Sequence, residues 1–162
     1  MKRIIHYLPE FFNTHHGVIE AIILMANIQK KTKKKFLILT NSKTPKKNKE
    51  FLRYRLSIKH MLMKKILVPL FFSLHPKIKK KDIFIIHSGF TLQNFIMSRI
   101  LYYHKIKYLV WPHGVYIENN LKKNFFTYLL KRLFIFFFEK KMLQDAKYII
   151  CCFDPEKESI IK

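Results

Sequence analysis

Short apolar runs alternate along the chain with longer segments whose apolar residues recur at helical spacing. Runs that are rich in aromatic and β-branched residues and lack polar alternation are typical of strands buried on both faces. Such runs predict strands at residues 3–8, 36–40, 82–86, 107–111 and 146–152. Helical spacing predicts helices at residues 18–29, 50–67, 92–103 and 121–144, and Asp154-Pro155-Glu156 is typical of a further helix start.

Strands that alternate with helices predict an α/β fold. We expect a Rossmann-like parallel sheet with helices on both faces. At 162 residues the chain is long enough for one domain with a sizeable core, which we place over residues 1–162.

Glycine is scarce, and its positions are informative. The chain has three glycines, each expected between the carboxyl end of a strand and the next helix: Gly17, Gly89 and Gly114. Four of the eight histidines lie beside them: His15, His16, His87 and His113. Because open parallel sheets bind ligands at this edge, we predict a ligand site there. The competing interpretation is that such turns favour glycine anyway and that loops tolerate histidine.

Two of these places suggest particular chemistry. Gly17 would let a ligand approach the backbone, and the amino end of the following helix would attract phosphate or another anion. His113 lies in a sharp turn between Pro112 and Gly114 at the end of a buried strand. Its imidazole can donate or accept a hydrogen bond at a sugar hydroxyl, although a lone histidine is more often structural than catalytic.

Other site types find little support in the sequence. Zinc bound by the clustered histidines is disfavoured, because adjacent histidines rarely ligate together and no carboxylate has ligand spacing. No serine or cysteine lies in a nucleophile elbow. We therefore expect no metal and no cofactor. The adjacent Cys151 and Cys152 are poorly placed to pair with each other and suit a reducing cytoplasm.

The formal net charge of +22 favours anionic partners, although a coding sequence rich in A and T would produce the same lysine excess. The lysine runs at residues 30–35 and 77–81 fall between elements, and no recognition motif appears, so we expect no nucleic acid. No apolar stretch is long enough to span a bilayer, and no signal peptide is evident. We expect a cytoplasmic protein, with peripheral attachment to the inner face of a membrane left open.

Residues 121–144 carry phenylalanine and leucine among lysines, which predicts an amphipathic helix. Such a helix can lie in a lipid interface, where basic side chains contact anionic headgroups. It can also pack its Phe-rich face on the sheet, as a crossover helix does. We expect the second arrangement.

In order and spacing, these motifs resemble the N-terminal half of family 4 glycosyltransferases. The first strand, the loop that ends at Gly17, the helix and the strand at 36–40 resemble the start of that family. Trp111-Pro112-His113-Gly114 resembles its Pro-His-Gly turn. Residues 138–160 resemble the helix, strand and Ser-x-x-Glu helix start that follow. The resemblance covers nearly the whole chain.

The resemblance implies a GT-B enzyme, in which two Rossmann-like domains face a cleft and the C-terminal domain holds most of the nucleotide-sugar donor. The N-terminal domain would bind a polysaccharide, lipopolysaccharide or lipid-linked acceptor of the cell envelope. His113 would be the catalytic residue beside the transferred sugar, and substrate would contact His16, Gly17, His87 and Gly114. Helix ends and basic side chains would stabilise the leaving diphosphate without a metal.

The chain departs from the family pattern at three places. His16 stands where the family commonly has a second glycine, and Phe153 replaces the serine of Ser-x-x-Glu, although Glu156 remains. The sequence also stops at Lys162, before a donor domain. We therefore expect a truncated product or half of a split enzyme, without transferase activity alone. The alternative is a non-catalytic basic module that binds an anionic membrane surface or nucleic acid.

Overall fold

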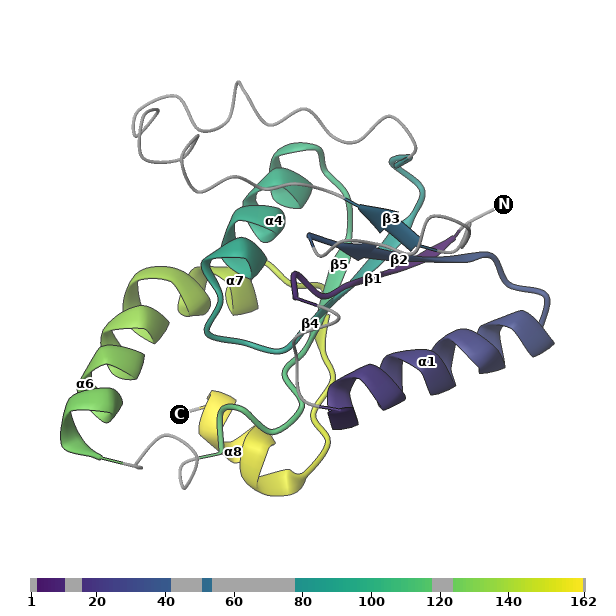
Figure 1. Cartoon of the computed structure of the whole chain (residues 1–162). Coiled ribbons are helices and arrows are strands. Elements are labelled where there is room, and N and C mark those ends of the chain that lie inside the picture. The colour runs from purple at the N-terminus through teal and green to yellow at the C-terminus, as the bar shows by residue number, and fades with distance from the viewer. Residues whose placement is uncertain (1–2, 11–15, 42–50, 54–77, 118–123, 162) are drawn as a thin grey trace.

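The protein is described by a computed structural model that covers residues 3–10, 16–41, 51–53, 78–117 and 124–161. Six parallel strands form one sheet in the order β3-β2-β1-β4-β5-β6 (Figure 1). The strands are β1 (Ile4–Tyr7), β2 (Phe36–Thr40), β3 (Phe51–Arg53), β4 (Ile83–His87), β5 (Tyr108–Trp111) and β6 (Tyr148–Ile149). This is the strand order of the doubly wound Rossmann fold, so the predicted α/β fold class is confirmed.

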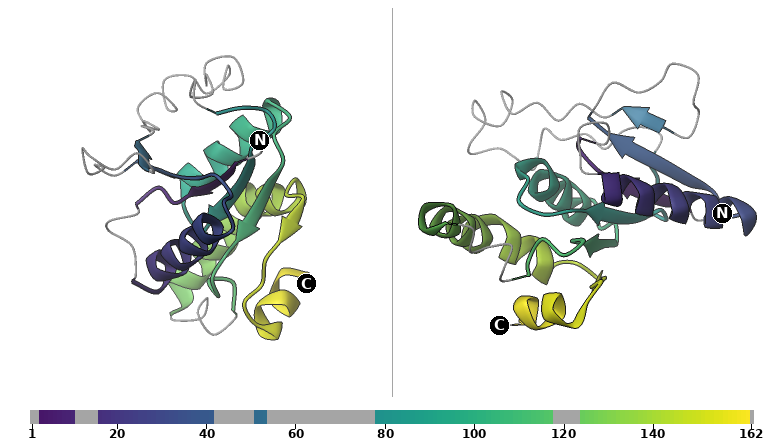
Figure 2. Two further views of the ribbon diagram at one scale, coloured as in Figure 1. Left: turned by 90° about the vertical axis from the view of Figure 1, so that its right-hand side faces the viewer. Right: turned by 60° about the horizontal axis from the view of Figure 1, so that its bottom comes forward.

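Helices cover both faces of the sheet, as parallel strands require. The described helices are α1 (His16–Lys31), α4 (Leu92–Tyr103), α6 (Phe125–Phe134), the π-helix η1 (Ile135–Glu139), α7 (Lys140–Gln144) and α8 (Asp154–Ile161). Helix α1 lies on one face, and α4 and α7 lie on the other (Figures 1 and 2). Among the described residues, no helix combines the length and hydropathy needed to cross a bilayer.

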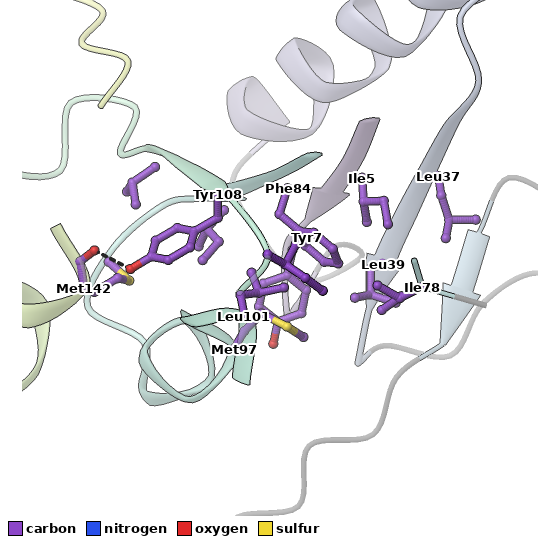
Figure 3. Packing of buried hydrophobic residues seen from close by; sticks show 13 residues of the cluster. Ile5, Tyr7, Leu37, Leu39, Ile78, Phe84, Met97, Leu101, Tyr108 and Met142 are labelled. Atoms are coloured by element: carbon purple, nitrogen blue, oxygen red, sulfur yellow. Dashed lines mark hydrogen bonds between the residues drawn. The ribbon is translucent and has the colours of Figure 1, made fainter. Parts of the chain in front are cut away.

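The larger core lies between the sheet and the pair α4 and α7. Alternate residues of four neighbouring strands supply its sheet side, including Tyr7, Phe84 and Tyr108 (Figure 3). Met97 of α4 and Met142 of α7 close it from the helix side. The Tyr108 hydroxyl is buried and donates a hydrogen bond to the Met142 carbonyl oxygen at 2.7 Å, so this polar group is satisfied inside the core.

A smaller core on the opposite face packs α1 against β2 and the residue that follows β1. Ile22 of α1 is fully buried against Leu8 and Ile38. The same face of β1 and β4 also carries two fully buried histidines, His6 and His87. Imidazoles are uncommon at fully buried positions, and both of these belong to the candidate site.

Three predicted elements differ from the observed ones in type, in continuity or by more than two residues at one end. The helix expected at residues 50–67 is wrong at its start, because β3 pairs there in parallel with β2; residues 54–77 lie outside the described part of the chain. The strand expected at 146–152 shortens to β6, at the sheet edge. The single helix expected at 121–144 is α6, η1 and α7, because the Lys140 N–H donates to the Ile135 carbonyl oxygen and widens one turn.

Candidate functional site

Three parallel strands bring histidines to the carboxyl edge of the sheet. His6 lies in β1, His87 is the last residue of the neighbouring β4, and His113 follows β5 by two residues. In the β1–β4 register His6 pairs with Ile85. His87 is two residues further along, so both imidazoles project from the same face of the sheet.

The three imidazoles and one amide form a continuous row of hydrogen-bonded groups, which we call the histidine chain. His6 Nδ1 lies 2.9 Å from His87 Nε2, and His87 Nδ1 lies 2.8 Å from His113 Nε2. At the inner end, His6 Nε2 lies 3.0 Å from Nε2 and 3.3 Å from Oε1 of Gln29, on α1. His6 and His87 are fully buried, so the histidine chain extends from the protein interior to His113.

The histidine chain links the tautomers of its members. Each neutral imidazole has one N–H and one lone pair, so every ring must donate at one end and accept at the other. The Gln29 amide sits at the inner end, and its orientation selects the direction. With the Gln29 nitrogen as the nearer atom, His6 accepts there, and each ring then donates through Nδ1. The Nδ1–H of His113 is left pointing out of the chain as a donor.

Burial keeps the rings of this chain neutral. Desolvation lowers the pKa of His113 to about 4. The pKa of His87 is lowered well below its usual value by burial and then by the neighbouring His6 and His113. Burial also lowers the pKa of His6, although the Gln29 hydrogen bond opposes the shift. At neutral pH the site therefore offers hydrogen bonds and not a cationic imidazolium.

The turn that carries His113 adopts a left-handed conformation, with φ of 59° at His113 and 80° at Gly114. This region is unfavourable for a residue with a Cβ, so His113 needs support from its surroundings. The Trp111 indole stacks on the His113 ring, with centroids 4.6 Å apart and planes 13° apart. The glycine at position 114 is explained by its backbone angle.

Two buried glutamates hold the loops at this edge. Glu156 of α8 accepts hydrogen bonds from Gly114 N at 2.5 Å and from Cys152 N at 3.1 Å. Glu139 of η1 accepts from Phe90 N at 2.8 Å in the loop after β4. Burial raises the pKa of Glu139 to about 8, against a weaker opposing effect of the Phe90 hydrogen bond. The two glutamate side chains thus fix the loop that follows His87 and the turn that contains His113.

The predicted site residues have different outcomes. The structure brings His87 and His113 together and places Gly114 next to His113. Gly17 lies in the exposed first turn of α1, which begins at His16, two residues before the expected start. An added Cβ at Gly17 would meet nothing within 4 Å, so the fold does not require glycine there. The side chain of His16, and all of His15, lie outside the described residues.

Three residues of the site were not predicted from the sequence: His6, Gln29 and Glu139. A signal was present for His6, because a histidine in the middle of a strand predicted to be buried has to find a polar partner. Gln29 lies near the end of the apolar face of α1 and is also buried. Glu156 belongs to the quoted Ser-x-x-Glu motif, but its two backbone partners were not foreseen.

The geometry of the ring nitrogens suits hydrogen bonds and not a shared metal ion. Nitrogen pairs at 2.8–2.9 Å face each other directly, which leaves no room for an ion between them. Among the described residues, no cluster of three or more histidine, cysteine, aspartate or glutamate side chains could hold a metal.

Comparisons of the chain with protein-family models, with curated proteins and with solved structures gave no match. Its function is therefore inferred from the fold, the histidine chain and the sequence motifs.

Proposed function

We propose that the chain is the acceptor-side domain of a glycosyltransferase similar to family 4, with His113 beside the transferred sugar. The observation that carries the proposal is the histidine chain, which holds His113 in one orientation at the carboxyl edge of the sheet. Ligands bind at this edge in open α/β sheets. An acceptor from a polysaccharide, a lipopolysaccharide or a lipid carrier fits the proposed role.

The proposed role of His113 is to donate a hydrogen bond from Nδ1–H to a sugar oxygen. The ring is neutral at pH 7, because its pKa is about 4. A neutral donor positions a hydroxyl without adding positive charge near an electron-deficient sugar carbon. His87, His6 and Gln29 act through His113: they set its tautomer and orientation and do not touch the substrate.

The test uses the full chain and paired ligands that differ only in the sugar. We expect UDP-glucose or GDP-mannose to shift the imidazole resonances of His113 and His87, whereas UDP and GDP alone do not. Replacing His113 with asparagine should weaken binding of the sugar nucleotide by roughly tenfold, the value of one hydrogen bond to ligand. Replacing His104, at the carboxyl end of α4, with asparagine is the matched control and should leave affinity unchanged.

Acceptor saccharides are titrated in the same way, since the proposed domain binds the acceptor side. The proposal would be abandoned if neither sugar nucleotides nor acceptor saccharides moved the His113 resonance at millimolar concentration. Equal shifts with UDP and UDP-glucose would also count against it, because they would place the nucleotide and not the sugar at His113.

A second candidate function, nucleic-acid binding, is favoured by the amino edge of the sheet. Basic residues immediately precede the strands, and parallel pairing collects them at one edge. Arg3, Lys35, Lys79 and Lys81 line one hollow of about 260 Å³. A larger hollow of about 490 Å³ is bordered by Lys80, Lys81, Lys105, Lys107 and Lys147. Lysine runs that are separate in sequence thus meet in space, which weakens one reason for excluding a polyanion.

Salt-dependent binding of single-stranded RNA separates the two functions. We test the double variant Lys80→Glu/Lys107→Glu. If this edge binds RNA, the slope of log affinity against log salt concentration should become smaller in magnitude by about two. The control Lys140→Glu/Lys157→Glu makes the same charge change on α7 and α8 and should keep the wild-type slope. Equal losses in both variants would mean unspecific attraction by the net charge.

A further inference from the structure

One side of the segment formed by α6 and η1 exposes large apolar side chains, which we call the apolar stripe. Its members are between 45 and 82 % exposed: Phe125, Phe126, Leu129, Leu130, Leu133, Phe136 and Phe137. They recur at helical spacing and so lie on one side of the helix. No residue of α6 is buried.

The other side of the segment already makes the contacts that attach it to the domain. The Phe134 ring lies 6.2 Å from that of Phe90, and the Phe138 ring lies 5.1 Å from that of Phe95. Lys131 Nζ lies 5.5 Å from the Phe90 ring centroid. The expectation that the Phe-rich face packs on the sheet is therefore wrong for the stripe: different aromatic residues face inward.

The charge of the chain indicates what covers the stripe. Arg132 of α6 and Lys140 and Lys141 of the adjoining α7 are exposed, with Lys141 paired to Asp145, and the whole chain carries a formal charge of +22. Two copies joined through the stripe would bring two such charges together, which opposes self-association. An anionic lipid surface attracts the same charges and offers an apolar layer to the phenylalanines.

We propose that the apolar stripe inserts into the interface of an anionic lipid membrane, with the helix lying in the membrane plane. A helix in this orientation needs an apolar face and basic neighbours, and it does not have to be long enough to cross the bilayer. Seven large side chains on one exposed side exceed the scattered apolar residues of an ordinary surface.

The segment that carries the stripe contacts the loop next to the candidate site through its other side. Phe90, which contacts Phe134 and Lys131, follows His87 by three residues in the loop at the carboxyl edge. Membrane attachment through α6 would therefore keep the histidine chain near the lipid surface, within reach of a lipid-linked acceptor. This consequence rests on the proposed function, whereas lipid binding itself does not.

Flotation with lipid vesicles tests the proposal. Wild-type chain should float with vesicles of phosphatidylcholine and phosphatidylglycerol in equal parts, and much less with phosphatidylcholine alone. The variant Phe126→Ser/Phe136→Ser/Phe137→Ser should reduce the partition coefficient roughly a hundredfold, because three exposed phenyl groups no longer leave water. The control Leu24→Ser/Ile28→Ser/Ile161→Ser removes apolar side chains that are 47–74 % exposed on α1 and α8 and should bind like wild type.

Each other outcome would overturn the proposal. Wild type that stays with the soluble fraction at low salt would show that the stripe does not bind lipid. A serine variant that binds as well as wild type would reduce the interaction to charge alone. Dimers that dissociate in the serine variant, seen by sedimentation without lipid, would assign the stripe to a second copy. Circular dichroism of each variant checks that the fold is retained.

Discussion

At pH 8, replacement of Glu139 by glutamine is expected to raise the free energy of unfolding, on the order of 4 kcal/mol. Burial raises the pKa of Glu139 from 4.5 in the unfolded chain to about 8 in the folded chain. The folded state therefore keeps a proton that the unfolded state releases, and stability from this group is lost as the pH rises from 4.5 to 8. Glutamine is always neutral and keeps an oxygen for Phe90 N.

The three histidines lower the stability of the fold at acidic pH, whereas Glu139 lowers it as the pH rises. The pKa values of His6, His87 and His113 are lowered in the folded state, so these groups cost stability as the pH falls below 6.5. Wild-type stability should therefore pass through a maximum near pH 7. The glutamine variant should keep the acid-side fall and show no decline between pH 7 and 8.

Urea unfolding between pH 5 and 8.5 measures both limbs of this profile. Glu158→Gln is the matched control, because Glu158 is exposed on α8 and should reproduce the wild-type curve. A Glu139→Gln curve that runs parallel to wild type through pH 8 would show that Glu139 is ionised in the folded protein.

The second large effect is expected at Glu156, where alanine should lower the free energy of unfolding by about 3 kcal/mol. The carboxylate accepts hydrogen bonds from Gly114 N and Cys152 N, and its removal leaves both backbone donors without this partner. The left-handed turn at His113 also loses its link to α8. We therefore expect the His113 ring to move away from His87.

Chemical denaturation measures the loss of stability, and imidazole NMR measures the separation of His113 from His87. Glutamine at position 156 should cost less than alanine, since one oxygen remains to accept a hydrogen bond. Glu158→Ala, on the same helix, should leave both readouts at wild-type values. A Glu156→Ala protein with unchanged stability and an unchanged His113 resonance would mean that the turn holds itself.

Much of the fold could be predicted because the central strands are continuous apolar runs with few alternatives. Phe36–Thr40 and Leu92–Tyr103 match the predicted ranges at both ends. The short β3 could not be recognised, because Phe51-Leu52-Arg53 is a strand only through pairing with β2. The π turn at η1 is equally non-local: it accompanies the contact of Glu139 with Phe90, 49 residues earlier.

The candidate site was predictable only in its outer part. Turn chemistry singles out His113, because Pro112 and Gly114 surround it at the end of a strand. The inner part depends on register: His6 reaches His87 only because β1 pairs with β4 in one alignment. Gln29 joins them from α1, and no local pattern relates it to either histidine.

The two glutamates that hold the site loops have a consequence for the order of biosynthesis. Both the loop after β4 and the turn after β5 are translated before Glu139 and Glu156, which secure them. Even with the central strands paired on the nascent chain, the His113 turn stays without its anchor until α8 has emerged from the ribosome. The site is therefore completed after all six described strands have been translated, and premature termination before Glu156 would leave the His113 turn without its anchor.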